Sequence, residues 1–140
     1  MKRILIILIT TIGLFNVANA DTISYWHVYY NDIRIKEFND FSKAEIVLNV
    51  RDIKPNDSLT IMYFRDTPCQ DCATEILIKN GHIIITKGKG EGTFHPIKIS
   101  VFDLLQYHLK VKKGIYDVFY CEKCISSQIG EKFLFSIKLE

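Results

Sequence analysis

The chain has 140 residues, with 18 lysines and arginines against 16 aspartates and glutamates, and a formal net charge of +2. This near balance excludes the strongly basic surface by which proteins bind nucleic acid or anionic membranes. Two of the basic residues, Lys2 and Arg3, precede an apolar run at the N-terminus, and without them the two counts are equal at 16.

The N-terminus has the three regions of an export signal. The two basic residues are followed by a mostly apolar stretch over residues 4–15 and by the small-x-small cleavage site Ala18-Asn19-Ala20. The apolar stretch is shorter than the roughly 20 residues that a membrane-spanning helix needs. We therefore expect residues 1–20 to be a cleaved signal peptide. Residues 21–140 are then one secreted or periplasmic domain with no membrane span after cleavage.

Apolar and polar residues alternate along most of the mature chain, which is typical of half-buried β-strands. Tight turns are predicted at Asn31-Asp32 and Asn80-Gly81, because these residue types tolerate positive φ, and a further turn at Pro55-Asn56-Asp57. The pattern predicts seven strands, then a helix, then two strands. The strands cover about residues 25–30, 33–38, 46–50, 59–64, 75–79, 82–87, 93–99, 115–120 and 133–139.

One helix is predicted at about residues 101–110. Ser100 followed by Asp103 is a variant of the capping box, and apolar residues then recur at helical spacing. Lysines gather near its end, and Gly114 is the expected stop. Strands joined mainly by short turns, with one inserted helix, predict an all-β fold that is an antiparallel β-sandwich.

Two segments resemble parts of immunoglobulin-like bacterial sandwiches. Ile53-Lys-Pro-Asn-Asp-Ser-Leu-Thr-Ile61 is similar to their turn-and-strand entry, and Gly114-Ile-Tyr-Asp-Val-Phe-Tyr120 to their penultimate strand, with Tyr116 at the position of a corner-locking tyrosine. With Trp26-His-Val-Tyr29 and Phe64-Arg-Asp-Thr-Pro-Cys69, the mature chain also resembles small uncharacterised secreted proteins of Bacteroidota. The resemblance implies an immunoglobulin-like sandwich and no particular activity, and the inserted helix departs from the plain pattern.

All four cysteines lie in two Cys-x-x-Cys pairs, Cys69 with Cys72 and Cys121 with Cys124. An oxidising compartment favours a disulfide framework, for which three pairings are possible. Bridges within each pair would close small rings and stabilise little. A bridge such as Cys69–Cys121 would close a loop of about 50 residues and contribute ~4 kcal/mol.

Two other interpretations of the cysteines stay open. All four sulfurs could hold zinc tetrahedrally, although the pairs are further apart than the usual ~15–20 residues. Alternatively, Cys69 and Cys72 could be the reactive pair of a thiol-disulfide oxidoreductase. Asp66, Asp71 and Glu122 place negative charge near the cysteines in sequence, which opposes thiolate formation.

The first strand carries aromatic residues on both faces, and Tyr25, Trp26, Tyr29 and Tyr30 form a candidate ligand surface. The plainer interpretation is that one face belongs to the core and a neighbouring element covers the other. The glycine-rich run over residues 88–93 resembles a phosphate-binding loop only in composition, because no helix follows it. We interpret this run as a mobile hairpin connection.

Together these patterns predict a secreted, disulfide-stapled β-sandwich that acts as a binding or structural module at the cell envelope. The expected partner is an unidentified protein or glycan, and no cofactor is expected. An enzyme is the less favoured class, because the sequence contains no nucleophile elbow, zinc-protease helix or paired-carboxylate motif. The alternatives are a four-cysteine zinc module and the oxidoreductase.

Overall fold

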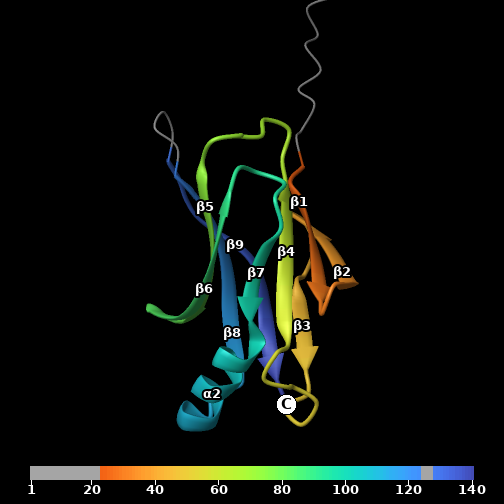
Figure 1. Ribbon diagram of the computed structural model, residues 1–140, viewed down its shortest axis with the longest axis vertical. Helices are drawn as coiled ribbons and strands as arrows, with labels where there is room; N and C mark the ends of the chain where they lie inside the picture. Colours follow the sequence, from red (N-terminus) through yellow and green to blue (C-terminus); the bar gives the residue numbers. More distant parts are fainter. Residues whose placement is uncertain (1–22, 124–127) are drawn as a thin grey trace, which may run out of the picture.

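The computed structural model describes residues 23–123 and 128–140, so the expected signal peptide and Cys124 lie outside the described residues. Two sheets pack face to face, with strand orders β2-β1-β4-β7 and β3-β9-β8-β5-β6 (Figure 1). The predicted all-β sandwich and the order of its elements are confirmed. The elements are β1 (Tyr25–Tyr30), β2 (Ile33–Asn39), β3 (Glu45–Leu48), β4 (Ser58–Phe64), β5 (Ala73–Asn80), β6 (Ile83–Glu91), β7 (Ile97–Ser100), α2 (Val101–Val111), β8 (Ile115–Lys123) and β9 (Gln128–Leu139).

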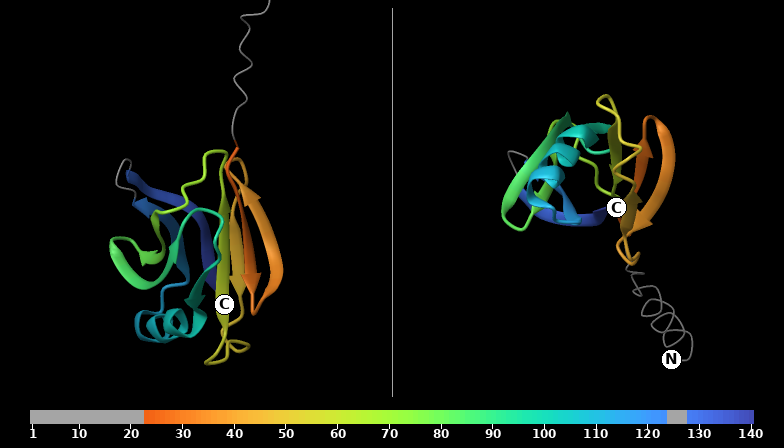
Figure 2. Two further views of the ribbon diagram at one scale, coloured as in Figure 1. Left: turned by 45° about the horizontal axis from the view of Figure 1, so that its top comes forward. Right: turned by 90° about the horizontal axis from the view of Figure 1, so that it is seen from below.

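Figure 2 shows the two sheets from one end. The hydrophobic core lies between them. Alternate residues of most strands point into it, as the period of two requires, and the most buried of them are mainly branched or aromatic. Val28 and Ile61 contribute from one sheet, and Ile76, Val118 and Phe135 from the other. One pairing departs from the antiparallel prediction, because β3 runs parallel to its neighbour β9.

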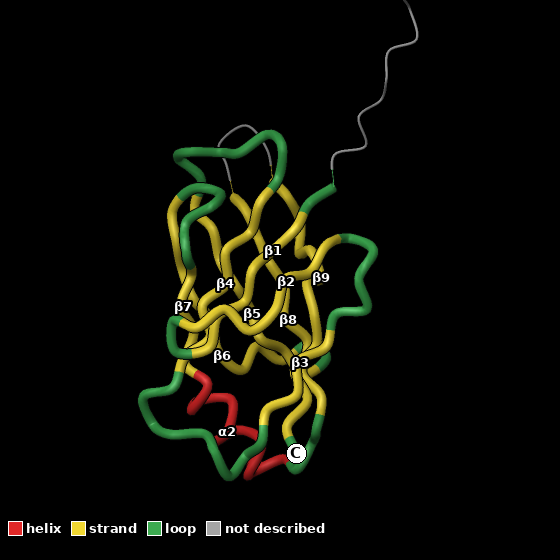
Figure 3. Tube along the Cα trace, turned by 90° about the vertical axis from the view of Figure 1, so that its right-hand side faces the viewer, coloured by secondary structure: helices red, strands yellow, loops and turns green. Residues whose placement is uncertain are grey.

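Local signals in the sequence account for the turns and the helix. Asn31 and Asp32 both have positive φ, as does Gly81, so both predicted hairpin turns are confirmed. The Ser100 hydroxyl accepts a hydrogen bond from the Asp103 amide at 3.2 Å, as the capping box predicts. The helix ends three residues before the expected stop, with Lys112 in the left-handed conformation. It lies at the end of the sandwich opposite the β4–β5 loop (Figure 3).

The glycine-rich run is not a mobile connection, because Gly88 and Gly90 lie within β6, and the strand expected over residues 93–99 begins only at Ile97. A Cβ atom at Gly88 would lie 2.6 Å from the Lys98 carbonyl oxygen and 2.7 Å from a methyl carbon of Ile97. Because Gly88 has no side chain, the backbone of β6 can lie close to β7, which brings the two sheets together on this side of the sandwich.

We expect Gly88→Ala to lower the free energy of unfolding by about 1–3 kcal/mol, because the added methyl group must push β6 away from β7. Urea denaturation of the purified protein measures this. Gly130→Ala is the matched control, since a Cβ atom there would meet nothing within 4 Å. Equal effects of the two substitutions would contradict the close approach as the reason for the glycine.

Candidate functional site

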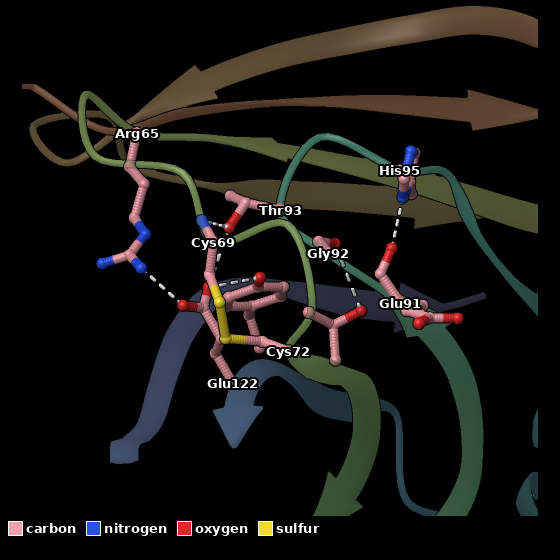
Figure 4. The surroundings of a disulfide bond; sticks show 10 residues. Arg65, Cys69, Cys72, Glu91, Gly92, Thr93, His95 and Glu122 are labelled. Carbon is pink, nitrogen blue, oxygen red and sulfur yellow. Dashed lines mark hydrogen bonds and ion pairs between the residues drawn. A yellow bond between two sulfur atoms is a disulfide. The ribbon is translucent and has the colours of Figure 1, made fainter. Parts of the chain in front are cut away.

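Cys69 and Cys72 form a disulfide in the loop between β4 and β5, with their Cα atoms 5.8 Å apart (Figure 4). Of the pairings that the sequence left open, the structure therefore has the local bridge for this pair. Cys121 is a free, buried thiol, so the long-range bridge between Cys69 and Cys121 is not formed.

Backbone hydrogen bonds hold this loop in place independently of the sulfur–sulfur bond. The Cys69 amide donates to the Thr93 hydroxyl at 2.8 Å, and the Thr93 amide donates to the Cys69 carbonyl at 2.7 Å. The Gly92 amide donates to the Cys72 carbonyl at 2.7 Å. Gly92 has a φ of 77°, and a Cβ atom there would lie 2.7 Å from the Gln70 carbonyl oxygen. Only glycine suits this position, where the connection after β6 supports the cysteine loop.

A buried carboxylate lies beneath the disulfide. Glu122 of β8 has no exposed surface, and its Oε1 forms an ion pair with the guanidinium of Arg65. Its Oε2 accepts hydrogen bonds from the hydroxyls of Tyr120 at 2.9 Å and Thr93 at 3.1 Å. Burial of Tyr120 and its bond to this carboxylate raise the pKa of the tyrosine. These partners replace the water that a charged carboxylate loses on burial.

The two sulfurs and one oxygen of Glu122 all lie within 4.8 Å of one another. Cys72 and Glu122 are buried, whereas Cys69 is partly exposed. Such a set can hold a metal ion only when the disulfide is reduced, because zinc binds thiolates and not the sulfurs of a disulfide. Sequence reasoning noted Glu122 only as one of three negative charges near the cysteines and missed that its carboxylate lies beside the Cys69–Cys72 disulfide.

Cys121 lies on the other side of the same sheet. Successive residues of a strand point to opposite faces, and Cys121 is opposite Glu75 of β5, whereas Glu122 is opposite the buried Thr74. Burial raises the pKa of the Cys121 thiol, with nearby Glu131 adding to the effect. The structure thus brings Cys69 and Cys72 together with Glu122 and not with Cys121, while the fourth member of the predicted zinc set, Cys124, lies outside the described residues.

The four aromatic residues of the first strand do not form one surface. Trp26 is only 2% exposed and belongs to the core, so its assignment to a ligand surface is wrong. Tyr30 packs against the core and donates its hydroxyl hydrogen bond to Asp57. Tyr25 and Tyr29 point to the opposite, outer face of the sheet, as the alternation along β1 requires.

On that outer face, rings from three segments form a continuous stack. Tyr25 stacks on Phe64 with centroids 4.7 Å apart, and Phe64 stacks on Phe94 at 5.4 Å. His27 lies 5.0 Å from the Phe64 ring and 6.3 Å from that of Tyr29. Tyr25 and Phe94 remain 40% and 37% exposed, so neighbouring elements do not fully cover these rings. We call these five residues the aromatic face.

A second surface lies between the edge strands β2 and β3. Its cleft has a volume of about 740 Å³, and its apolar lining includes Ile33, Ile35 and Val47.

Comparison with known proteins gives neither a matching family nor a matching curated protein. Among the described residues, no helix has the length and apolar character needed to cross a membrane.

We expect reduction of the Cys69–Cys72 bond to lower the free energy of unfolding by only about 2 kcal/mol, the chain-entropy value for so short a loop. The fold should persist, because the hydrogen bonds to Thr93 and Gly92 remain. Urea denaturation with and without a phosphine reductant measures the difference. The double variant Cys69→Ser, Cys72→Ser is the control and should show no further loss on reduction; unfolding on reduction would contradict the prediction.

We expect Glu122→Gln to lower the free energy of unfolding by about 3 kcal/mol, because it leaves the Arg65 charge without its partner in a largely buried position. Glu37→Gln removes an exposed carboxylate of β2 and should change stability by no more than about 0.5 kcal/mol. Thermal or urea denaturation of both variants provides the comparison. If both variants lost the same small amount of unfolding free energy, the Arg65–Glu122 pair would contribute no more to stability than an exposed charge.

Proposed function

We propose that this protein is an exported binding module of the cell envelope and that its aromatic face contacts a glycan. The observation that carries the proposal is the stack of partly exposed rings centred on Tyr25 and Phe64. Export is supported by the predicted signal peptide and by the Cys69–Cys72 disulfide, a bond typical of oxidising compartments. The disulfide has a structural role in this proposal.

The chemistry of the face suits a sugar. The C–H face of a pyranose ring is apolar and flat, so it can lie against an aromatic ring, while its hydroxyls need hydrogen-bonding partners at the edge. His27 lies in the middle of the aromatic face, and its Nε2 is 3.1 Å from the carboxylate of Glu37 on β2. This pair provides donors and acceptors beside the rings.

The aromatic face is also organised before any ligand arrives. Tyr25 and Phe64 are directly opposite each other on the paired strands β1 and β4, and each ring limits the rotation of the other. Rings on rigid strands lose little side-chain entropy when a ligand binds, which favours weak but specific recognition.

We expect Tyr25→Ala to weaken binding of chito-oligosaccharides or muropeptides about tenfold, because one stacked ring contributes roughly 1 kcal/mol or more. Binding is measured by calorimetry and by amide chemical-shift changes. Phe133→Ala is the matched control, since this ring is 47% exposed but lies on the other sheet. Absence of glycan binding, or shifts confined to the cleft between β2 and β3, would contradict the proposal and favour a protein partner.

A further inference from the structure

Three potential metal ligands, Cys69, Cys72 and Glu122, meet at the disulfide end of the sandwich, and a disulfide joins two of them. We propose that reduction of the Cys69–Cys72 bond creates a site for one thiophilic divalent cation such as zinc, held by both thiolates and by Glu122. This site is independent of the glycan proposal, because it lies beneath the β4–β5 loop and uses none of the aromatic face.

The distances suit such an ion. Zinc binds sulfur at about 2.3 Å and carboxylate oxygen at about 2.0–2.2 Å, so two ligands of one tetrahedral ion lie about 3.6–3.8 Å apart. The sulfurs and the Glu122 oxygen already lie within 4.8 Å of one another. Opening the disulfide lets the sulfurs separate toward the spacing of a tetrahedral site. The Cys-x-x-Cys spacing is itself the one that metal-binding knuckles use.

The ligands are held in position by bonds that reduction does not break. Backbone hydrogen bonds from Thr93 and Gly92 fix the carbonyls of Cys69 and Cys72. Arg65, Thr93 and Tyr120 fix the carboxylate of Glu122. Outer partners of this kind orient metal ligands and strengthen their binding. The reduced protein therefore presents the three groups together without refolding.

Charge favours a divalent ion. Two thiolates and the Glu122 carboxylate carry three negative charges, and Arg65 compensates one of them. A divalent cation neutralises the remaining two, whereas two bare thiolates beside a buried carboxylate would repel each other.

The chemistry balances in two steps. A phosphine supplies two electrons, and water supplies two protons and the oxygen of the phosphine oxide, so that the disulfide becomes two thiols. A divalent ion then binds both sulfurs and displaces the two protons. A small-molecule disulfide then acts as the oxidant: it accepts the two electrons and becomes two thiols, the Cys69–Cys72 bond forms again, and the ion is released. The site thus exists only in the reduced protein.

The test uses the protein purified after export, reduced with a phosphine under nitrogen and titrated with Co²⁺, whose spectrum reports thiolate ligands. We expect one Co²⁺ per chain, thiolate-to-cobalt charge-transfer bands, release of two protons, and displacement by Zn²⁺. The unreduced protein should show none of these signals. Absence of charge-transfer bands after reduction, or equal binding by the unreduced protein, would overturn the proposal.

Variants assign the ligands. Cys69→Ser or Cys72→Ser should remove the charge-transfer bands, and Glu122→Gln should weaken binding by at least tenfold. Cys121→Ser is the matched control and should bind as the wild type, because that thiol lies on the opposite face. Loss of binding in Cys121→Ser would overturn the three-ligand site and favour the four-cysteine site.

A second measurement does not depend on a variant that folds. Bound Zn²⁺ should protect Cys69 and Cys72 of the reduced wild type from alkylation in buffer without denaturant. Cys121 reacts slowly with or without metal because it is buried. Protection is therefore scored for each cysteine as the ratio of its alkylation rates with and without metal. Peptide mapping by mass spectrometry gives this ratio for each cysteine. We expect a change only at Cys69 and Cys72; protection of Cys121 by metal, or of no cysteine, would overturn the proposal.

Discussion

The ion pair between the partly exposed Arg65 and the fully buried Glu122 is the interaction on which the disulfide end of this sandwich depends. Arg65 directly follows β4 of one sheet, and Glu122 lies in β8 of the other, so the pair joins the two sheets at this end. A fully buried carboxylate is stable only when an ion pair and hydrogen bonds replace the water that it loses. Here the hydroxyls of Thr93 and Tyr120 donate the hydrogen bonds that Arg65 does not supply. Thr93 in turn holds the loop that carries Cys69. The charge pair, the cysteine loop and the connection after β6 therefore form one connected polar network at this end of the sandwich.

Much of the fold could be predicted because local signals determine it. Strict alternation predicts the strands, Asn31 and Gly81 match their turns, and Ser100 caps the helix as expected. The errors arise where tertiary contact outweighs composition. Gly88 has the composition of a loop, yet its missing side chain serves the approach of β6 to β7. The direction of β3 is set by its pairing with β9, which no local pattern reveals.

The candidate site was only half predictable, for a geometric reason. Alternation along β8 shows that Cys121 and Glu122 point to opposite faces, but which of those faces is the inner one depends on the partner strand. Apolarity suggests the cysteine as the inner residue, whereas the structure turns the charged residue inward because Arg65 is there to meet it. The same holds for the aromatic residues of β1: alternation predicts that Trp26 and Tyr25 lie on opposite faces, but only the structure shows that Trp26 is buried and Tyr25 exposed.

The pairing of β3 with β9 also bears on how the chain folds. Glu45 lies beside Ser136, about 90 residues later in the sequence, so this part of the sheet forms only after a large loop has closed. Hairpins such as β1–β2 and β5–β6 close loops of a few residues and can form early. Until β9 arrives, β8 has one unpaired edge and β3 has no partner strand at all. A newly made chain in that state exposes unpaired strand edges that other chains can pair with, so the risk of aggregation lasts until β9 has paired with β8 and β3.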